Sequence, residues 1–180
     1  MKPDPVVVRG DGLVLREWCE TDLARMPALF DNPEAVRWTP LETPFDLAAA
    51  QRYLEKARAA RAERRGLNLA ITHDGDEPLG EVLLFRLDGN PTLEMGYSIG
   101  PAHRGAGLAA RATRLAADEV ATRWGVRRFR LMIAPDNIAS RRAATCAGAV
   151  LLPVPLVTRS GPRRDVELET WEITRGSRST

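Results

Sequence analysis

The spacing of apolar positions changes several times along the chain, and each change predicts a new element. Residues 12–16 alternate between apolar and polar positions, as in a strand. In residues 21–30 the apolar side chains Leu23, Met26 and Phe30 are three and four positions apart, which is typical of a helix. Pro27 lies inside this second segment and should bend or split the helix. A longer helix is predicted from a cap at Thr43 to the polar run near Arg65.

The middle of the chain has the pattern of strands. Residues 67–72, 78–86 and 92–99 predict three of them. The turn sequences Asp74-Gly75 and Asp88 to Pro91 lie between these strands, and both favour tight reversals of the chain. We therefore expect an antiparallel meander.

Helices and strands alternate in the last part of the chain. A helix is predicted from about Arg104 to Trp124, a strand over residues 128–133, and a second helix from Asn137 to Gly148. Residues 149–157 and 163–173 should form a closing hairpin. The whole pattern predicts one α/β (α+β) domain over residues 1–180, with a mixed, mostly antiparallel sheet of about seven strands flanked by four or five helices.

Composition excludes several classes of protein. The chain has 180 residues, 26 basic and 24 acidic side chains and two cysteines. This balance argues against a nucleic-acid binder, and two cysteines are too few for a disulfide framework. No window has the length and apolar character of a signal peptide or membrane span, so we expect a cytoplasmic protein without a membrane partner. All basic residues except Lys2 and Lys56 are arginines, a bias that can simply reflect the coding genome.

The most informative segment is a glycine-rich turn between a predicted strand and a predicted helix, Arg104-Gly105-Ala106-Gly107-Leu108-Ala109. The first turn of a helix has unpaired N–H groups and a positive dipole end, which bind phosphate oxygens, and glycines leave room for an anion. A tight connection that binds nothing is the alternative. The segment does not match a P-loop or the dinucleotide-binding fingerprint, because it lacks Gly-Lys-Ser/Thr and has Ala110 in place of the third glycine.

The chain resembles the GNAT (Gcn5-related N-acetyltransferase) superfamily. Arg104-x-x-Gly107-x-Ala109 fits that family's pyrophosphate-binding signature, and the order of predicted elements matches over nearly the whole chain. Leu15-Arg16, Glu94 to Tyr97 and Asn137-x-x-Ser140 followed by a glycine look like the Rim-type (RimJ/RimL-like) branch, whose namesakes acetylate ribosomal-protein N-termini.

The resemblance implies that acetyl-CoA is the cosubstrate. Backbone amides of the glycine-rich turn would hold the pyrophosphate, and the edge of the preceding strand would pair with pantetheine. A direct attack of an amine on the thioester requires no metal. The residues assigned to acetyl-CoA in this way are Tyr97, Ser98, Ile99, Arg104, Gly105, Ala106, Gly107, Leu108, Ala109, Asn137 and Ser140.

The resemblance also suggests catalytic residues. Glu94 is the candidate base, with two alternatives: it pairs with an arginine, or it only orients the amine. Glu81 is a second choice near the acceptor. Many family members have a tyrosine acid in the second helix, which this chain lacks; Ser140 is the candidate hydrogen-bond donor to sulfur, and Asn137 contacts the ligand or only caps the helix.

The acceptor is expected to be a primary amine, either a protein N-terminus or a small molecule. Trp38 lies in the region that shapes the acceptor pocket in this family, or else belongs to the core. Alternatives are a larger donor such as succinyl-CoA and a non-catalytic acyl-CoA-binding module. A homodimer through the last hairpin is a further expectation.

Overall fold

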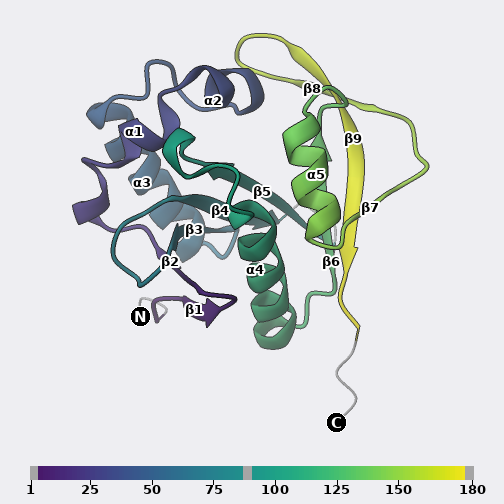
Figure 1. The fold of residues 1–180 in the computed structure, drawn as a ribbon, viewed down its shortest axis with the longest axis horizontal. Helices are drawn as coiled ribbons and strands as arrows, with labels where there is room; N and C mark the ends of the chain where they lie inside the picture. The colour runs from purple at the N-terminus through teal and green to yellow at the C-terminus, as the bar shows by residue number, and fades with distance from the viewer. Residues whose placement is uncertain (1–3, 87–90, 177–180) are drawn as a thin grey trace.

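The structure is a computed structural model that describes residues 4–86 and 91–176. Within these residues the chain forms nine strands, five α-helices and two short 3₁₀ turns (Figure 1). The strands are β1 Val7–Gly10, β2 Leu13–Glu17, β3 Gly66–Thr72, β4 Gly80–Arg86, β5 Leu93–Ile99, β6 Arg128–Ile133, β7 Val150–Leu151, β8 Val157–Ser160 and β9 Asp165–Thr174. The helices are α1 Met26–Phe30, α2 Pro33–Trp38, α3 Leu47–Ala62, α4 Leu108–Trp124 and α5 Ile138–Cys146, and the 3₁₀ turns are η1 Glu20–Asp22 and η2 Pro101–His103.

The strands form a mixed sheet in the order β1-β2-β3-β4-β5-β6-β9-β7, and β8 pairs with β9 as a hairpin. Strands β1 to β5 follow one another as an antiparallel meander. Among the strand pairs of the described residues only β5 and β6 are parallel, because α4 crosses over between them. The predicted fold class, a single mixed and mostly antiparallel α/β sheet with flanking helices, is therefore confirmed.

The parallel pair β5 and β6 is short. Its register joins Leu93, Glu94 and Met95 of β5 to residues 129–131 of β6, while β4 pairs with β5 along its full length to Ile99. Beyond Met95, no strand of residues 4–86 or 91–176 lies beside the edge of β5 that faces β6. The sheet consequently opens at the end of β5 that leads into α4.

Each face of the sheet has its own apolar core. The larger one joins both ends of the sheet to α4 and α5, and the second is an aromatic cluster under α1 and α3. Figure 1 shows α4 and α5 on the near face and α3 on the far face. Phe30 and Phe45 pack edge to face in the second core, with ring centroids 5.4 Å apart.

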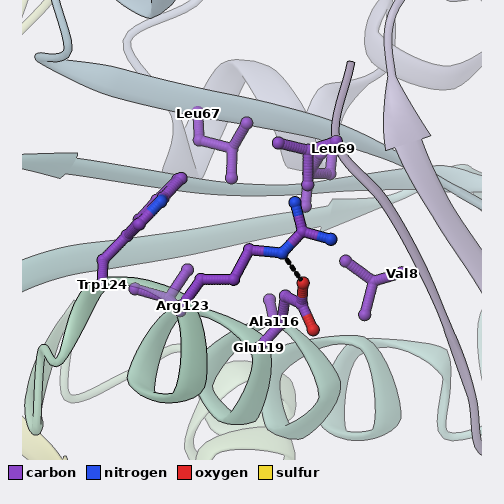
Figure 2. A pocket seen from close by; sticks show the side chains of 9 residues that line it. Val8, Leu67, Leu69, Ala116, Glu119, Arg123 and Trp124 are labelled. Carbon is purple, nitrogen blue, oxygen red and sulfur yellow. Dashed lines mark ion pairs between the residues drawn. The ribbon is translucent and has the colours of Figure 1, made fainter. Parts of the chain in front are cut away.

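Helix α4 lies directly on the first strands of the sheet. Val8 and Leu69 of the sheet and the buried Ala116 of α4 line a small pocket between the two layers (Figure 2). Glu119 and Arg123 form an ion pair one helical turn apart along the rim of this contact. The helix is thereby positioned with its first turn at the open end of the sheet.

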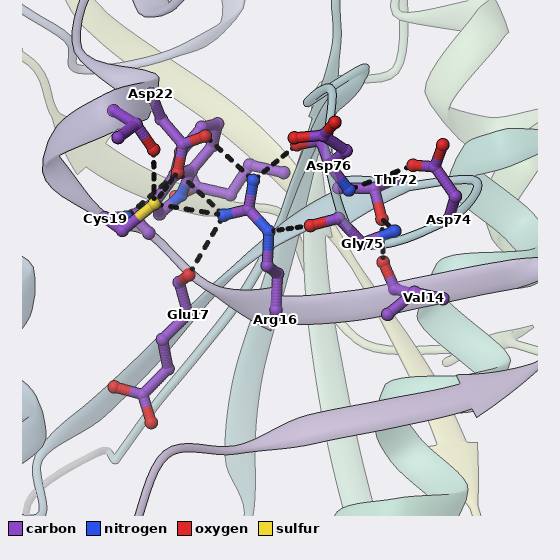
Figure 3. A network of polar contacts seen from close by, with 12 residues as sticks. Val14, Arg16, Glu17, Cys19, Asp22, Thr72, Asp74, Gly75 and Asp76 are labelled. Carbon is purple, nitrogen blue, oxygen red and sulfur yellow. Dashed lines mark hydrogen bonds and ion pairs between the residues drawn. The ribbon is translucent and has the colours of Figure 1, made fainter.

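Arg16 fixes the path of the chain after β2. Its guanidinium binds both carboxylate oxygens of Asp22 at 2.7 and 2.8 Å, and it donates to the carbonyls of Gly75 and Asp76 at 2.5 Å each (Figure 3). Burial would raise the pKa of Asp22, but its hydrogen bonds to Arg16 and Cys19 hold it below the ordinary value. Arg16, part of the Rim-type pattern, thus joins η1 to the turn between β3 and β4.

Several predicted boundaries in the N-terminal half are wrong. Strand β1 was not predicted, because its four residues are too short for a clear alternation. Asp46, rather than Thr43, caps α3, accepting a hydrogen bond from the backbone N–H of Ala49 at 2.8 Å. Phe45 is buried and its N–H binds Asp31 at 3.0 Å, so residues 43–45 belong to the connection.

The C-terminal half also differs in detail. Helix α4 begins at Leu108 and not at Arg104, because η2 and two glycines with positive φ occupy the segment before it. The first arm of the closing hairpin is divided into β7 and β8, with Pro153 and Pro155 between them. These additions explain why nine strands occur where about seven were predicted.

The remaining elements agree with the sequence. The predicted helix over residues 21–30 is split as expected, although the break lies before α1 and Pro27 is in the first turn of that helix. The three-strand meander and β6 occur as predicted, and Gly125 ends α4 with φ 69°. Asp88 to Asn90, part of a predicted turn, lie outside the described residues. In the described part of the chain every ion pair takes its cation from an arginine, and no helix is long and apolar enough to span a membrane.

Candidate functional site

The glycine-rich turn is an open cradle at the start of α4. Gly105 and Gly107 have φ of 81° and 69°, a region that favours glycine, and both are exposed. A Cβ atom added at either position would meet nothing within 4 Å. The N-cap of α4 is Gly107, so no capping side chain accepts from the N–H groups of the first turn. Such a cradle fits an anionic group of several oxygens.

Arg104 is anchored beside the cradle. Its Nε donates to the carbonyl of Ile99 at 3.1 Å, and its Nη2 donates to the side chain of Asn32 at 3.0 Å. Asn32 is also the cap of α2, where its side chain accepts from Ala35 N–H. Arg104 therefore joins the end of β5 to the start of α2 while its charge stays at the surface.

Ala106 is exposed on the same turn, and Leu108 is buried beneath it as the first residue of α4, followed by half-buried Ala109. The side chain of Leu108 thus holds the turn on the core. Tyr97, Ser98 and Ile99 form the free edge of β5 next to this turn. The cradle and the opening between β5 and β6 are in this way continuous along the chain.

Tyr97 bridges the opening on the α5 side. Its hydroxyl donates to the Ser140 carbonyl at 2.7 Å and lies 2.9 Å from the Ser140 hydroxyl. Burial raises the pKa of Tyr97 to about 12, so the phenol keeps its proton at ordinary pH. Asn137 caps α5 by accepting from the Ser140 N–H at 3.1 Å. A tyrosine hydroxyl is therefore present at α5, although it comes from β5.

Glu94 lies on the opposite face of β5 and is tied to an arginine. Arg159 of β8 binds both carboxylate oxygens, Nη1 to Oε1 at 2.6 Å and Nη2 to Oε2 at 2.9 Å. The carboxylate is almost fully buried, with 6% of its side chain exposed, whereas 46% of Arg159 is exposed. Of the roles considered for Glu94, pairing with an arginine is the one present in this structure.

Glu81 is buried in a polar cluster on the same face. It accepts from Trp18 Nε1 at 2.7 Å, from the Tyr53 hydroxyl at 2.5 Å and from Asn68 Nδ2 at 3.2 Å. Burial raises the pKa of Glu81 above its ordinary value, against the lowering effect of these three donors. With 3% of the residue exposed, Glu81 is shielded from solvent behind this cluster.

Trp38 ends α2 at the rim of this face. The residue is half-buried, its Nε1 donates to Glu34 at 2.9 Å, and the guanidinium of Arg37 lies 4.3 Å from the ring centroid. Arg37 also pairs with Asp136, just before α5, at 2.9 Å. Trp38 is thus outside the aromatic core and close to the segment that leads into α5.

Arg163 connects the tip of the β8–β9 hairpin to the end of α2. Its guanidinium donates to the carbonyls of Val36, Thr39 and Leu41 at 2.5, 2.6 and 3.1 Å and to the hydroxyl of Thr43 at 3.1 Å. Figure 1 shows this hairpin reaching over the molecule toward α2. The hairpin and the α2–α3 connection therefore meet above the face that carries Glu94.

Other features lie away from this site. A hollow of about 450 Å³, lined by Arg61, Arg64, Arg65, Arg86 and apolar side chains, is found at the start of β5 and the end of α4, the opposite end from the cradle. Among the described residues no group of three or more His, Cys, Asp or Glu side chains could hold a metal ion.

The predicted site residues fall into three groups. The cradle and the edge of β5 form one continuous surface, and Tyr97, Ser140 and Asn137 adjoin it at α5. Glu94 lies across the strand from them, on the face of the sheet that also carries the buried Glu81, while Trp38 lies apart at the end of α2. Sequence reasoning missed Arg159 and Arg163, because nothing distinguishes them from the other arginines until the hairpin is folded over the sheet.

The chain matches the model of the acetyltransferase (GNAT) domain over residues 12–150. This match covers well over half of the chain, which belongs to the GNAT family of acetyltransferases and is an acyltransferase. Uncharacterized N-acetyltransferase YoaA of Bacillus subtilis (strain 168) is 27% identical over 138 residues, or 76% of this chain and 78% of that protein.

Solved structures share the fold. Mycobacterium smegmatis RimJ in complex with CoA-disulfide superposes with a TM-score of 0.78 and 22% identity, over 99% of this chain and 90% of that chain. Spermidine N-acetyltransferase of Vibrio cholerae, in complex with CoA and spermine, gives a TM-score of 0.75 and 17% identity, over 92% and 96% of the two chains. At these identities both likenesses are likenesses of the fold.

Proposed function

We propose that this chain transfers an acetyl group from acetyl-CoA to a primary amine. The observation that carries the proposal is the open glycine cradle at the start of α4, which adjoins the free edge of β5 where β5 and β6 separate. RimJ and the spermidine acetyltransferase share this fold, and their structures are complexes with CoA-disulfide and with CoA and spermine, respectively.

The donor would be held by main-chain groups. The N–H groups of residues 105–109 bind the pyrophosphate oxygens, favoured by the positive end of the α4 dipole. Arg104 adds a positive charge next to them. On the open edge of β5, the amides of pantetheine pair with backbone groups of residues 97–99 like an added strand, next to the Ile99 carbonyl that already accepts from Arg104 Nε. The thioester then lies between Tyr97 with Ser140 on one side and Glu94 on the other.

The reaction needs a neutral amine and a stabilised leaving group. The amine attacks the thioester carbonyl, a backbone N–H of β5 stabilises the oxyanion, and the C–S bond then breaks. Ser140, hydrogen-bonded to the Tyr97 hydroxyl, is placed to donate to the departing sulfur, while Asn137 holds the first turn of α5. Glu94 accepts the proton of the amine only when Arg159 has moved aside, because both carboxylate oxygens are otherwise engaged.

Free-thiol release from acetyl-CoA, measured with a mixed panel of amines, tests the proposal. Turnover that depends on both acetyl-CoA and an amine supports it. Binding of acetyl-CoA without turnover on any acceptor would instead support a non-catalytic acyl-CoA-binding module. Faster release of free thiol from succinyl-CoA than from acetyl-CoA would identify succinyl-CoA as the donor.

We also infer that two copies of the chain associate through the hairpin region. Five apolar side chains are between 40% and 66% exposed there: Val150, Leu151, Val154, Leu156 and Val157. A run of exposed apolar residues on adjacent segments is typical of an interface. Analytical ultracentrifugation of wild type and Leu156→Glu tests this; a monomeric wild type at micromolar concentration would contradict it.

A further inference from the structure

The Glu94–Arg159 ion pair points to the class of acceptor. We propose that the acceptor is a small amine with a carboxylate next to the reacting nitrogen, as in a free α-amino acid, and that it binds by exchanging with this ion pair. The ammonium takes the place of Arg159 on Glu94, and the carboxylate takes the place of Glu94 on Arg159. This inference rests on the proposed acetyl transfer.

The two partners are unequally held, which makes the exchange feasible. Glu94 is fixed on the central strand β5 with 6% of its side chain exposed, whereas Arg159 is on the outer hairpin and 46% exposed. Arg159 can therefore move toward solvent while Glu94 stays in place. Glu94 cannot remain unpaired at low cost, since removing one partner of a buried ion pair leaves an uncompensated charge away from water. A cation from the acceptor has to replace the guanidinium.

A carboxylate on the acceptor satisfies the displaced guanidinium. The fork of Arg159 already binds a carboxylate through two parallel hydrogen bonds, at 2.6 and 2.9 Å, and it can bind another in the same geometry. A plain amine or a peptide N-terminus would satisfy Glu94 and leave Arg159 without an anion. Of the two acceptor classes considered for this chain, the structure thus favours a small zwitterion.

The closed rim above Glu94 supports a small acceptor. Four hydrogen bonds from Arg163 join the hairpin tip to residues 36–43, the connection between α2 and α3. These residues and Glu94 lie on the same side of the sheet, so a protein chain would have to part the hairpin from α2. A single amino acid needs only the movement of Arg159.

The exchange also explains release of the product. The ammonium gives up two protons in all, and its nitrogen forms the amide bond to the acetyl carbon as the C–S bond breaks. One of these protons ends on the sulfur of CoA and the other passes to solvent. The product amide carries no positive charge and no longer neutralises Glu94. Arg159 then returns to Glu94 and leaves the product carboxylate unpaired.

The test compares the twenty α-amino acids with their α-carboxamides as acceptors. A neighbouring carboxylate favours the charged ammonium, so at neutral pH the carboxamides have more neutral amine and should react faster if charge recognition is absent. We expect at least one amino acid to exceed its own carboxamide by tenfold or more in kcat/KM. The preference should disappear in Arg159→Met while the KM for acetyl-CoA stays within about twofold.

Arg128→Met is the matched control. Arg128 is equally exposed, at 50%, and pairs with Glu172 through two hydrogen bonds, but it lies at the start of β6, away from the opening. It should keep the preference for the acid. If Arg159→Met does not fold, Glu94→Gln/Arg159→Met removes the unpaired charge, and its ratio of acid to carboxamide rates should likewise fall to one or below.

The remaining outcomes separate the two proposals. Carboxamides that react as well as the acids in wild type overturn the zwitterionic acceptor and leave acetyl transfer intact. Thermal protection by acetyl-CoA without turnover of any amino acid also overturns it. Absence of protection by acetyl-CoA overturns the proposed function itself.

Discussion

At single positions, the two glycines that flank α4 form a matched pair. Gly107 and Gly125 both have φ of 69°, and an added Cβ would meet nothing within 4 Å at either. Alanine in this region costs roughly 1–2 kcal/mol of stability. Only the methyl group at residue 107 would occupy the cradle proposed for pyrophosphate.

We therefore expect Gly107→Ala and Gly125→Ala to lose similar free energy of unfolding but to differ in function. The KM for acetyl-CoA should rise at least tenfold in Gly107→Ala and stay unchanged in Gly125→Ala. Urea unfolding and steady-state kinetics measure the two effects. Equal KM values for both variants would mean that the glycine-rich turn does not bind acetyl-CoA.

Glu81 should make stability depend on pH. Burial raises the pKa of its carboxyl in the folded state, so the folded protein binds this proton more tightly than the unfolded chain. The stabilisation is complete below the ordinary glutamate pKa and is lost as the pH rises through the folded value. Glu81→Gln, which does not titrate, should gain stability relative to wild type between pH 4.5 and 7.5 in urea unfolding. A difference that is constant over this range would contradict the assignment.

Single residues also show where prediction from sequence ends. Glu94 was identified as an important acid from its place before the cradle, but its partner Arg159 is 65 positions away. Local spacing contains no information about such a pair. The same holds for the hydroxyl of Tyr97, whose contact with Ser140 depends on how α5 is placed over β5.

At the scale of elements, the β8–β9 hairpin is held to α2 mainly by Arg163. Its replacement by alanine removes four hydrogen bonds, and since the side chain is exposed we expect a loss of only about 1 kcal/mol in local stability. Hydrogen exchange at residues 157–160 should then accelerate roughly fivefold. Arg164→Ala, at the next position, is the control. Unchanged exchange in Arg163→Ala would mean that the hairpin is held by other contacts.

Most elements were predictable because their signals are local. Turn residues and glycine stops identified the meander, α4 and α5 from the sequence alone. The errors arose where tertiary contacts override a local signal. Thr43 and Asp46 are both acceptable caps, and burial of Phe45 decides between them. The first arm of the hairpin is another such case. Pro153 and Pro155 divide it into β7 and β8, and both parts are strands only because they pair with β9.

At the scale of the whole molecule, acetyl-CoA should protect the fold. A ligand at 100 times its Kd stabilises the folded state by about 2.7 kcal/mol. For a chain of this size that corresponds to an increase in Tm of roughly 5–10 °C. Differential scanning fluorimetry with acetyl-CoA measures it, and Gly107→Ala at the same concentration should show a clearly smaller increase. No increase in wild type would contradict the proposed donor.

The arginine ion pairs have a practical consequence for any such experiment. A guanidinium stays protonated up to very high pH and does not attack a thioester, whereas the amine of a lysine does. This chain has side-chain amines only at Lys2 and Lys56. Spontaneous acylation of the enzyme's own amines is therefore limited to few sites, so that transfer to added acceptors can be followed at high enzyme concentration with little background from its surface.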